Sequence, residues 1–256
     1  MSADLLPSRF RAIARHNFVL LSRDPGQIVG YTITPMLMMI ALRPIYAARG
    51  DEAAGTVQAT IGPLVLFSLL TLNVIGHSVL NERTWRTWNR LRSTAATSVE
   101  LLLGKCLPFF LMLLVQQTIL VVFSAVVFDL RLRPYAVLCT AFVILLWSAT
   151  ILGFGALLAT AARTHGQLNT ITDIGSFMVT VVGGGLTPLA NMPDWMRVIA
   201  PFSPGYWALD AYRHALNGDS LHDLAGPVLV LMVLCALATA GAASLTARRA
   251  GARLRA

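Results

Sequence analysis

Residues 58–94 read QATIGPLVLFSLLTLNVIGHSVLNERTWRTWNRLRST, and this stretch decides the fold. Its first part, 58–80, is almost entirely apolar, whereas 81–94 carries four arginines and two tryptophans. The hydrocarbon core of a bilayer is about 30 Å thick, and a helix needs about 20 mostly apolar residues to cross it. The pattern therefore predicts a membrane-spanning helix that ends in a basic, aromatic segment at the membrane surface.

Five further stretches repeat the apolar pattern of 58–80. The set AVILMFWYC makes up 56% of the 256 residues and the charged set only 12%, about half the charged share usual in soluble proteins. We expect an all-α polytopic membrane protein that forms one transmembrane domain over residues 1–256. The six predicted spans are 27–47, 58–80, 106–128, 135–160, 169–187 and 225–247.

The distribution of Lys and Arg predicts the orientation of these spans. Fourteen of the twenty lie in the N-terminal segment, in 81–105, in 161–168 and in the C-terminal tail, all on one predicted side. The positive-inside rule makes that side cytoplasmic, together with both termini, and we expect the protein in the cell membrane. This asymmetry explains the formal charge of +8, so the sequence does not favour nucleic acid as a partner.

The basic segment has two faces if it is helical. Arg83, Arg86 and Arg90 fall on one side at 100° per residue, and Trp85 and Trp88 fall on the other. We expect the tryptophans to anchor the helix at the membrane and the arginines to face a cytoplasmic partner. The alternative is that the arginines are topology anchors attracted to anionic lipid.

The N-terminal segment 1–26 shows apolar residues at steps of three and four, with arginines mostly off that stripe. This pattern predicts an amphipathic helix at the cytoplasmic interface, although a helix packed on its own protein would look the same. The segment shows no signal-peptide cleavage pattern, so we expect the first span to be retained.

Polar residues inside the spans are candidates for a transport path. Asn73 and His77, four apart, share a face of the second span, and Asp173 and Phe177 have the same spacing in the fifth. They either line a pathway or hold the helices together by hydrogen bonds. For Asp173 a position at the membrane boundary is a third possibility.

The segment 188–224 keeps apolar and aromatic residues but is broken by four prolines. This composition predicts short re-entrant helices on the outer side, covered by protein or by a water-filled cavity.

The sequence gives no sign of catalysis or of a bound cofactor. It contains no phosphate-binding loop with its lysine. Ser176 has no glycine after it, and among the histidines only His77 lies well within a predicted span, on a different helix, which disfavours an intramembrane protease. His77 alone is too little for a metal site. The three cysteines lie in apolar runs and are expected to pack as small hydrophobic residues.

Two groups of short motifs stand beside the predicted spans. After span two come Asn81-Glu82-Arg83, Leu91-Arg92-Ser93-Thr94 and Leu103-Gly104-Lys105. Around span five come Gly184-Gly185-Leu186-Thr187-Pro188, Met192-Pro193-Asp194-Trp195, Pro204-Gly205-Tyr206-Trp207 and Ala211-Tyr212-Arg213. In these motifs and their order the chain resembles a known family, the membrane-spanning permeases of type 2 ABC exporters. The chain departs from the pattern at Arg86-Thr87 and Ala95-Ala96, where relatives commonly carry Gly-Thr and a proline.

The resemblance implies roles for the motif residues. The segment 81–105 would contain the coupling helix that docks on the ATPase, and 1–26 would be the connecting helix. The implied ATPase-coupling residues are Glu82, Arg83, Arg86, Arg90, Leu91, Arg92 and Thr94. The implied outer gate consists of Pro188, Pro193, Trp195, Pro204, Tyr206 and Arg213.

The resemblance also implies partners. The permease would pair with a second copy or a related permease and with two copies of a separate ATPase, which binds ATP and Mg. The apolar, aromatic-rich path favours a drug, an antibiotic or a lipid as cargo over a polysaccharide. The alternative function is an ion- or proton-coupled secondary transporter with His77 and Asp173 as its coupling groups.

Overall fold

The structure is a computed structural model that describes residues 25–48, 51–84, 98–130, 132–162 and 164–253. Within these ranges every regular element is helical and no strand occurs, so the prediction of an all-α protein is confirmed for this part of the chain. The elements are α2 (Pro25–Ala47), α3 (Glu52–Thr84), α5 (Ser98–Val127), α6 (Pro134–Ala161), α7 (His165–Val182), η1 (Leu189–Asn191), α8 (Asp194–Ile199), η2 (Ala200–Phe202), α9 (Pro204–Asn217) and α10 (Leu221–Arg253).

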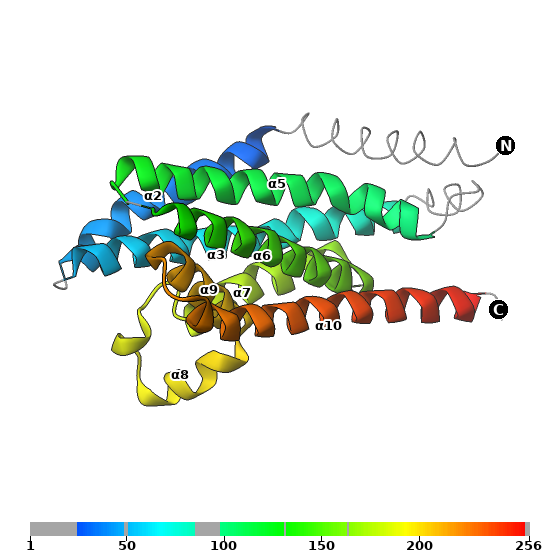
Figure 1. Cartoon of the computed structure of the whole chain (residues 1–256). Coiled ribbons are helices and arrows are strands. Elements are labelled where there is room, and N and C mark those ends of the chain that lie inside the picture. The colour runs from blue at the N-terminus through cyan, green and yellow to red at the C-terminus, as the bar shows by residue number, and fades with distance from the viewer. Residues whose placement is uncertain (1–24, 49–50, 85–97, 131, 163, 254–256) are drawn as a thin grey trace.

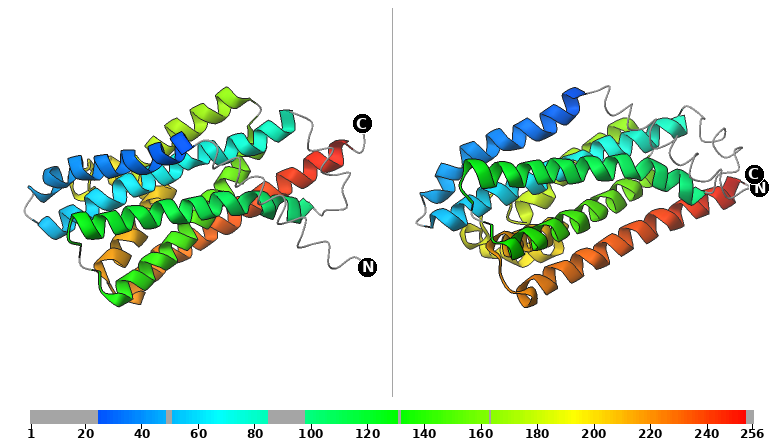
Figure 2. Two further views of the ribbon diagram at one scale, coloured as in Figure 1. Left: turned by 90° about the horizontal axis from the view of Figure 1, so that it is seen from above. Right: turned by 45° about the horizontal axis from the view of Figure 1, so that its top comes forward.

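The long helices run side by side along one direction, with α3 at the centre of the bundle (Figures 1 and 2). Helix α3 packs against α2, α5, α6, α7 and α9, whereas α10 packs on α6 and α9. One end of the bundle holds the end of α2, the start of α3, the end of α5 and the start of α6 together with α8 and α9 (Figure 1). The end of α3, the start of α5 and the end of α10 lie at the opposite end (Figure 1).

A long helix occupies each of the six predicted spans. In the described chain, four of these helices are long and apolar enough to cross a membrane: α3, α5, α6 and α10. The crossing of all six remains a prediction. Helix α7 ends at Val182, before the predicted end of the fifth span at 187. The following glycines form a turn in which Gly184 has φ +94°, a left-handed conformation that suits glycine.

The core lies between α3, α5, α6 and α9. Trp147 of α6 is completely buried there, and its indole N–H donates to the hydroxyl of Ser68 on α3 at 2.8 Å. Leu64, Leu113 and Leu209, from three other helices, are also buried in this core. Apolar burial combined with a satisfied indole N–H holds these helices in one register.

The segment 188–224 contains the short helices that its prolines predict. Pro188 precedes η1, Pro193 precedes α8 and Pro204 is the first residue of α9. These positions suit proline because the first turn of a helix needs no N–H donor there. Helix α9 enters the core, and Ala208 and Tyr212 are fully buried. Whether these helices re-enter a membrane remains a prediction.

Most of the N-terminal and coupling predictions concern residues outside the described chain. Segment 1–24 and residues 85–97 are not described, and these include Trp85, Trp88, Arg86, Arg90, Leu91, Arg92 and Thr94. Glu82 and Arg83 belong to the last turn of α3, which continues without interruption from the predicted second span.

Candidate functional site

A row of polar contacts joins α3 to α7, and we call it the polar seam. Its members are Asn73 and His77 of α3 and His165, Asn169 and Asp173 of α7. Asn73 Nδ2 donates to Asp173 Oδ1 at 3.1 Å. His77 Nε2 lies against Asn169 Oδ1, and its Nδ1 lies 2.8 Å from His165 Nδ1.

Helical spacing explains why the seam forms. Residues four apart on a helix share one face, so two residues on α3 can meet three residues on α7. The structure therefore brings together three of the four predicted path residues, Asn73, His77 and Asp173. The fourth, Phe177, lies one turn beyond Asp173 and is 49% exposed.

The donors and acceptors of the seam can be assigned from the chemistry of its groups. A carbonyl oxygen only accepts, so His77 Nε2 carries the hydrogen that faces Asn169. In a neutral His77, Nδ1 is then an acceptor, and it receives the Nδ1–H of His165. The two rings are parallel within 3°, with centroids 4.9 Å apart.

The seam also has an open side. Asn169 and Asp173 are exposed on α7, although they occupy a helix in an apolar bundle. Exposed amide and carboxylate groups are costly against lipid and normally face water or another protein. This face of α7 is therefore suited to lining a polar path or an interface.

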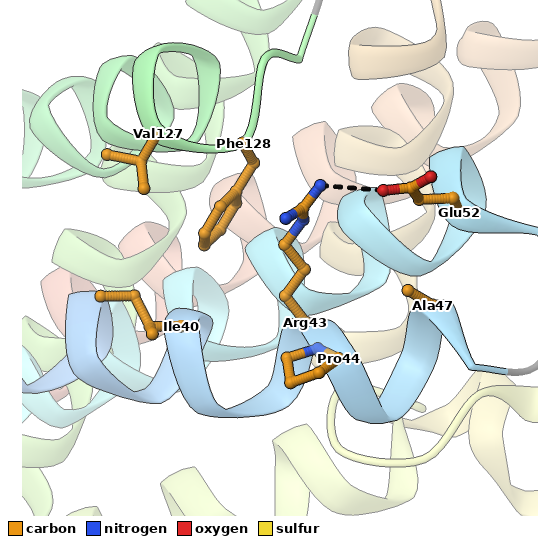
Figure 3. A pocket seen from close by; sticks show the side chains of 7 residues that line it. All are labelled: Ile40, Arg43, Pro44, Ala47, Glu52, Val127 and Phe128. Carbon is orange, nitrogen blue, oxygen red and sulfur yellow. Dashed lines mark hydrogen bonds and ion pairs between the residues drawn. The ribbon is translucent and has the colours of Figure 1, made fainter.

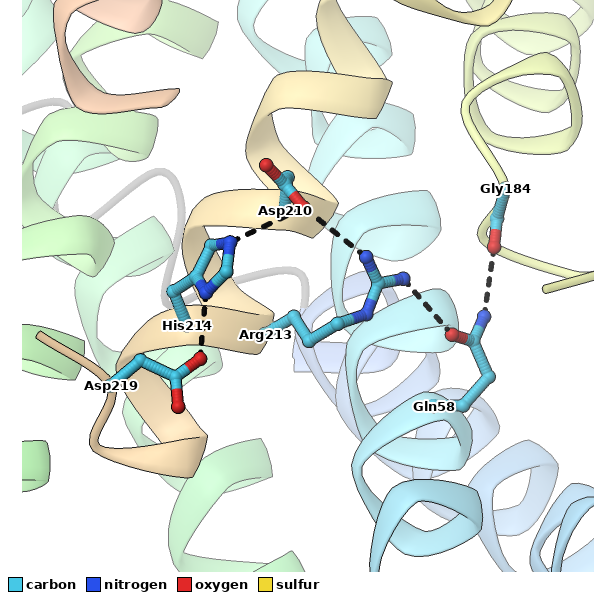
Figure 4. A network of polar contacts seen from close by, with 6 residues as sticks. All are labelled: Gln58, Gly184, Asp210, Arg213, His214 and Asp219. Carbon is cyan, nitrogen blue, oxygen red and sulfur yellow. Dashed lines mark hydrogen bonds and ion pairs between the residues drawn. The ribbon is translucent and has the colours of Figure 1, made fainter. Parts of the chain in front are cut away.

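A second polar group, which we call the outer junction, joins α3, α9 and the glycine turn (Figure 4). Gln58 Nε2 donates to the carbonyl oxygens of Gly184 and Gly185 at 2.8 and 3.1 Å. Its Oε1 accepts from Arg213 Nη2 at 3.2 Å. Arg213 Nη1 also lies 3.3 Å from Asp210 Oδ1, so the guanidinium bridges α9 and α3.

His214 extends the outer junction along α9 (Figure 4). Its Nδ1 lies 2.7 Å from Asp219 Oδ2, and its Nε2 lies 3.7 Å from Asp210 Oδ1. Both carboxylates are partly buried and have a cation or a histidine beside them. The chain of contacts ties the end of α9 to the glycine turn.

The structure does not bring the predicted outer-gate residues together in one cluster of contacts. Arg213 belongs to the outer junction, and Tyr206 packs edge to face on Trp207 with centroids 5.0 Å apart. Pro188, Pro193 and Pro204 set the helix starts. Trp195 lies apart on α8 and is 64% exposed. The sequence reasoning missed Gln58, although a glutamine four residues before Gly62 in an apolar run was a usable signal.

A buried polar contact fixes α9 to the core. The Tyr212 hydroxyl donates to Gln117 Oε1 of α5, and Gln117 Nε2 donates to Ser148 Oγ of α6 at 2.8 Å. Burial raises the pKa of the Tyr212 hydroxyl well above its ordinary value, so the group stays protonated and able to donate.

Tyr212→Phe is expected to destabilise the protein because it leaves the buried Gln117 oxygen without this donor. Leaving a buried hydrogen-bond acceptor unsatisfied costs about 1–3 kcal/mol, so a loss of unfolding free energy of about this size is expected. Thermal unfolding in detergent measures the change. The matched control is Tyr135→Phe, because Tyr135 is exposed; an equal loss in both variants would contradict the assigned role.

Two candidate chemistries, a metal site and a serine nucleophile, can be compared with the described side chains. No group of three or more His, Cys, Asp or Glu among them could hold a metal ion. The Ser176 hydroxyl is buried and donates to the main-chain oxygen of Thr172 at 2.5 Å, not to a histidine. This geometry does not support the protease reading, because a serine nucleophile needs a general base within hydrogen-bond reach.

A bundle of long apolar helices with polar contacts between them defines the class of multi-pass helical membrane proteins. The family model described as ABC-2 type transporter matches residues 8–217. The chain therefore belongs to the ABC-2 type transporter family, whose permeases normally work with an ATPase subunit.

Two relatives illustrate the range of similarity. The linearmycin resistance permease protein LnrN of Bacillus subtilis (strain 168) is 29% identical over 203 residues, which cover 78% of this chain and 51% of LnrN. The probable multidrug ABC transporter permease YbhR of Escherichia coli (strain K12) is 22% identical over 192 residues, or 74% of this chain and 49% of YbhR. The chain thus spans about half the length of the curated relatives it matches.

Proposed function

We propose that this chain is the membrane-spanning permease subunit of an ATP-driven exporter, with an amphiphilic or hydrophobic cargo such as a drug, an antibiotic or a lipid. Family membership supports the transport role. The polar seam is the observation that supports a path for cargo beside α3 and α7. The names of LnrN and YbhR support antibiotic or drug cargo. A polysaccharide is the less favoured cargo.

The proposed topology has six spans in the cell membrane with both termini cytoplasmic. It places the end of α3, the start of α5 and the end of α10 at the cytoplasmic side, where most of the Lys and Arg residues lie. The opposite end of the bundle, with α8, α9 and the outer junction, is then the outer side.

Helix α3 supplies the mechanical link in this proposal. It runs as one helix from Glu52 to Thr84 and so joins the outer junction, the polar seam and the start of the proposed coupling segment. A force applied by an ATPase to residues 81–94 would move α3 along α7. Such a displacement would change the seam and shift the bundle between inward-facing and outward-facing arrangements.

ATP chemistry belongs to the partner in this proposal. Two copies of a separate ATPase would bind ATP and Mg, and the permease would pair with a second copy of itself or with a related permease. The exposed polar face of α7 supports such a pairing, because a second protomer would cover it or enclose a watery path beside it.

Replacing seam residues is expected to impair export. Asn73→Leu and Asp173→Leu each remove the contact between α3 and α7 and make the path surface apolar. A loss of one charge-assisted hydrogen bond predicts about a tenfold decrease in the rate of dye efflux from vesicles that contain permease and ATPase.

The matched control for this prediction is Thr170→Leu. Thr170 is also exposed on α7, but its hydroxyl donates to the main-chain oxygen of Gly166 in its own helix. Equal efflux from all three variants, at equal amounts of folded protein, would show that the polar seam is not part of the transport path.

The alternative function is an ion- or proton-coupled secondary transporter. The grouping of His77, His165 and Asp173 in one seam favours it, because these side chains can take up protons. This alternative predicts cargo movement driven by an imposed pH gradient in the absence of ATP, whereas the exporter predicts none.

A further inference from the structure

A pocket of about 320 Å³ opens where α2 ends and α3 begins, beside the end of α5 (Figure 3). It lies at the outer side of the proposed topology, away from the polar seam. Helix α5 is apolar enough to cross a membrane up to Val127, which lines the pocket. The pocket is therefore placed at the depth where lipid headgroups meet acyl chains.

The polar half of the pocket is formed by an ion pair between Arg43 and Glu52. Arg43 Nη2 lies 3.1 Å from Glu52 Oε1, and Arg43 Nε lies 3.4 Å from Thr56 Oγ1. The guanidinium carbon lies 5.2 Å from the centre of the Phe128 ring. The Arg43 side chain is 34% exposed and that of Glu52 is 76% exposed, so a ligand can reach both.

The other half of the pocket is apolar. Ile40 of α2 and Val127 of α5 form its wall on the side away from Glu52 (Figure 3). The exposed face of α2 continues from Ile40 through Leu37 to Ile33, at the three- and four-residue steps that keep one helix face. An acyl chain that starts at the pocket can therefore follow α2 into the bilayer.

We propose that this pocket binds a phospholipid with a zwitterionic phosphoethanolamine headgroup. An arginine has five N–H donors, and the contacts to Glu52 and Thr56 use two of its nitrogens, so Nη1 can bind the lipid phosphate. The lipid ammonium group binds the Glu52 carboxylate, and an acyl chain covers Ile40 and Leu37. A neutral pair of charges matches a neutral zwitterion better than it matches an anionic headgroup.

The headgroup chemistry makes the selectivity testable. A choline headgroup has no N–H to donate to Glu52, and a glycerol headgroup has no cation. Native mass spectrometry of the purified chain with equal concentrations of palmitoyl-oleoyl phosphatidylethanolamine, phosphatidylcholine and phosphatidylglycerol compares the three. We expect the ethanolamine lipid to bind about tenfold more tightly than either of the others, as one charge-assisted hydrogen bond predicts.

Single substitutions test whether the lipid binds in this pocket. Arg43→Gln is expected to weaken binding of the ethanolamine lipid about tenfold, whereas Arg43→Lys retains most of it. Glu52→Gln is expected to remove the preference over phosphatidylcholine, and its exposed side chain makes a folding defect a minor concern. The matched control is Arg197→Gln, because Arg197 lies 3.6 Å from Asp194 at the same end of the bundle but outside the pocket.

Equal binding of the three lipids would overturn the proposal, and so would equal effects of Arg43→Gln and Arg197→Gln. Free phosphoethanolamine at the lipid concentration is expected to leave the lipid bound, because it lacks the acyl chains. If free phosphoethanolamine displaced the lipid, the pocket would bind the headgroup without help from the acyl chains, and this result would contradict a lipid site. These measurements need neither ATPase nor cargo, so their outcome is independent of the export proposal.

Discussion

Gly62→Val is expected to prevent α3 from packing on the glycine turn and to abolish most of the yield of folded protein. A Cβ atom at Gly62 would lie 2.1 Å from the main-chain oxygen of Gly185. Two backbones would have to separate, and that separation would break the hydrogen bonds from Gln58 to Gly184 and Gly185. Overpacking of this kind costs roughly 3 kcal/mol or more when the obstacle is backbone.

Fluorescence-detected size-exclusion chromatography and thermal unfolding measure the effect of Gly62→Val. Gly175→Ala is the matched control, since Gly175 is also helical and a Cβ there meets nothing within 4 Å. We expect the control to fold normally. If Gly62→Val folded with an unchanged melting temperature, α3 would not pack directly on the glycine turn at Gly62.

Charge reversal at Arg86 and Arg90 is expected to uncouple the permease from its ATPase while membrane insertion remains intact. If these arginines face the ATPase, Arg86→Glu with Arg90→Glu places two carboxylates at the interface. Loss of buried charge pairs at protein interfaces costs 2–5 kcal/mol, which predicts at least about a tenfold fall in cargo-stimulated ATP hydrolysis.

Arg133→Glu is the control for this reversal, because Arg133 is an exposed arginine at the start of α6, at the end of the bundle away from the last residues of α3. It is expected to leave ATP hydrolysis unchanged. Normal coupling in the Arg86 and Arg90 variant would instead make these arginines topology anchors attracted to anionic lipid.

Span length and apolar composition were enough to predict the helices, because each long apolar run must satisfy its own backbone hydrogen bonds. Helix α7 ends five residues before the predicted end of the fifth span, for a local reason. The glycines after Val182 are compatible with an apolar run in a hydropathy pattern, but Gly184 adopts a left-handed conformation and ends the helix.

The partners of polar residues could not be predicted in the same way. The spacing of Asn73 and His77 gave a shared face, but only the packing of α3 on α7 reveals that Asp173, Asn169 and His165 meet it. Gln58 stands out in the sequence as a polar residue in an apolar run, but its partner could not be predicted, because it lies in a turn 126 residues away in the chain. Pairing between distant segments is a property of tertiary packing that one sequence does not display.

In the proposed mechanism, ATP hydrolysed by a separate subunit drives export through this chain. The most direct measurement is cargo transport in proteoliposomes that contain the permease with or without its co-purified ATPase. The exporter account predicts transport only when the ATPase and ATP are both present, and none from a pH gradient alone. Transport that follows the pH gradient without ATP, from a permease that binds no ATPase, would contradict it.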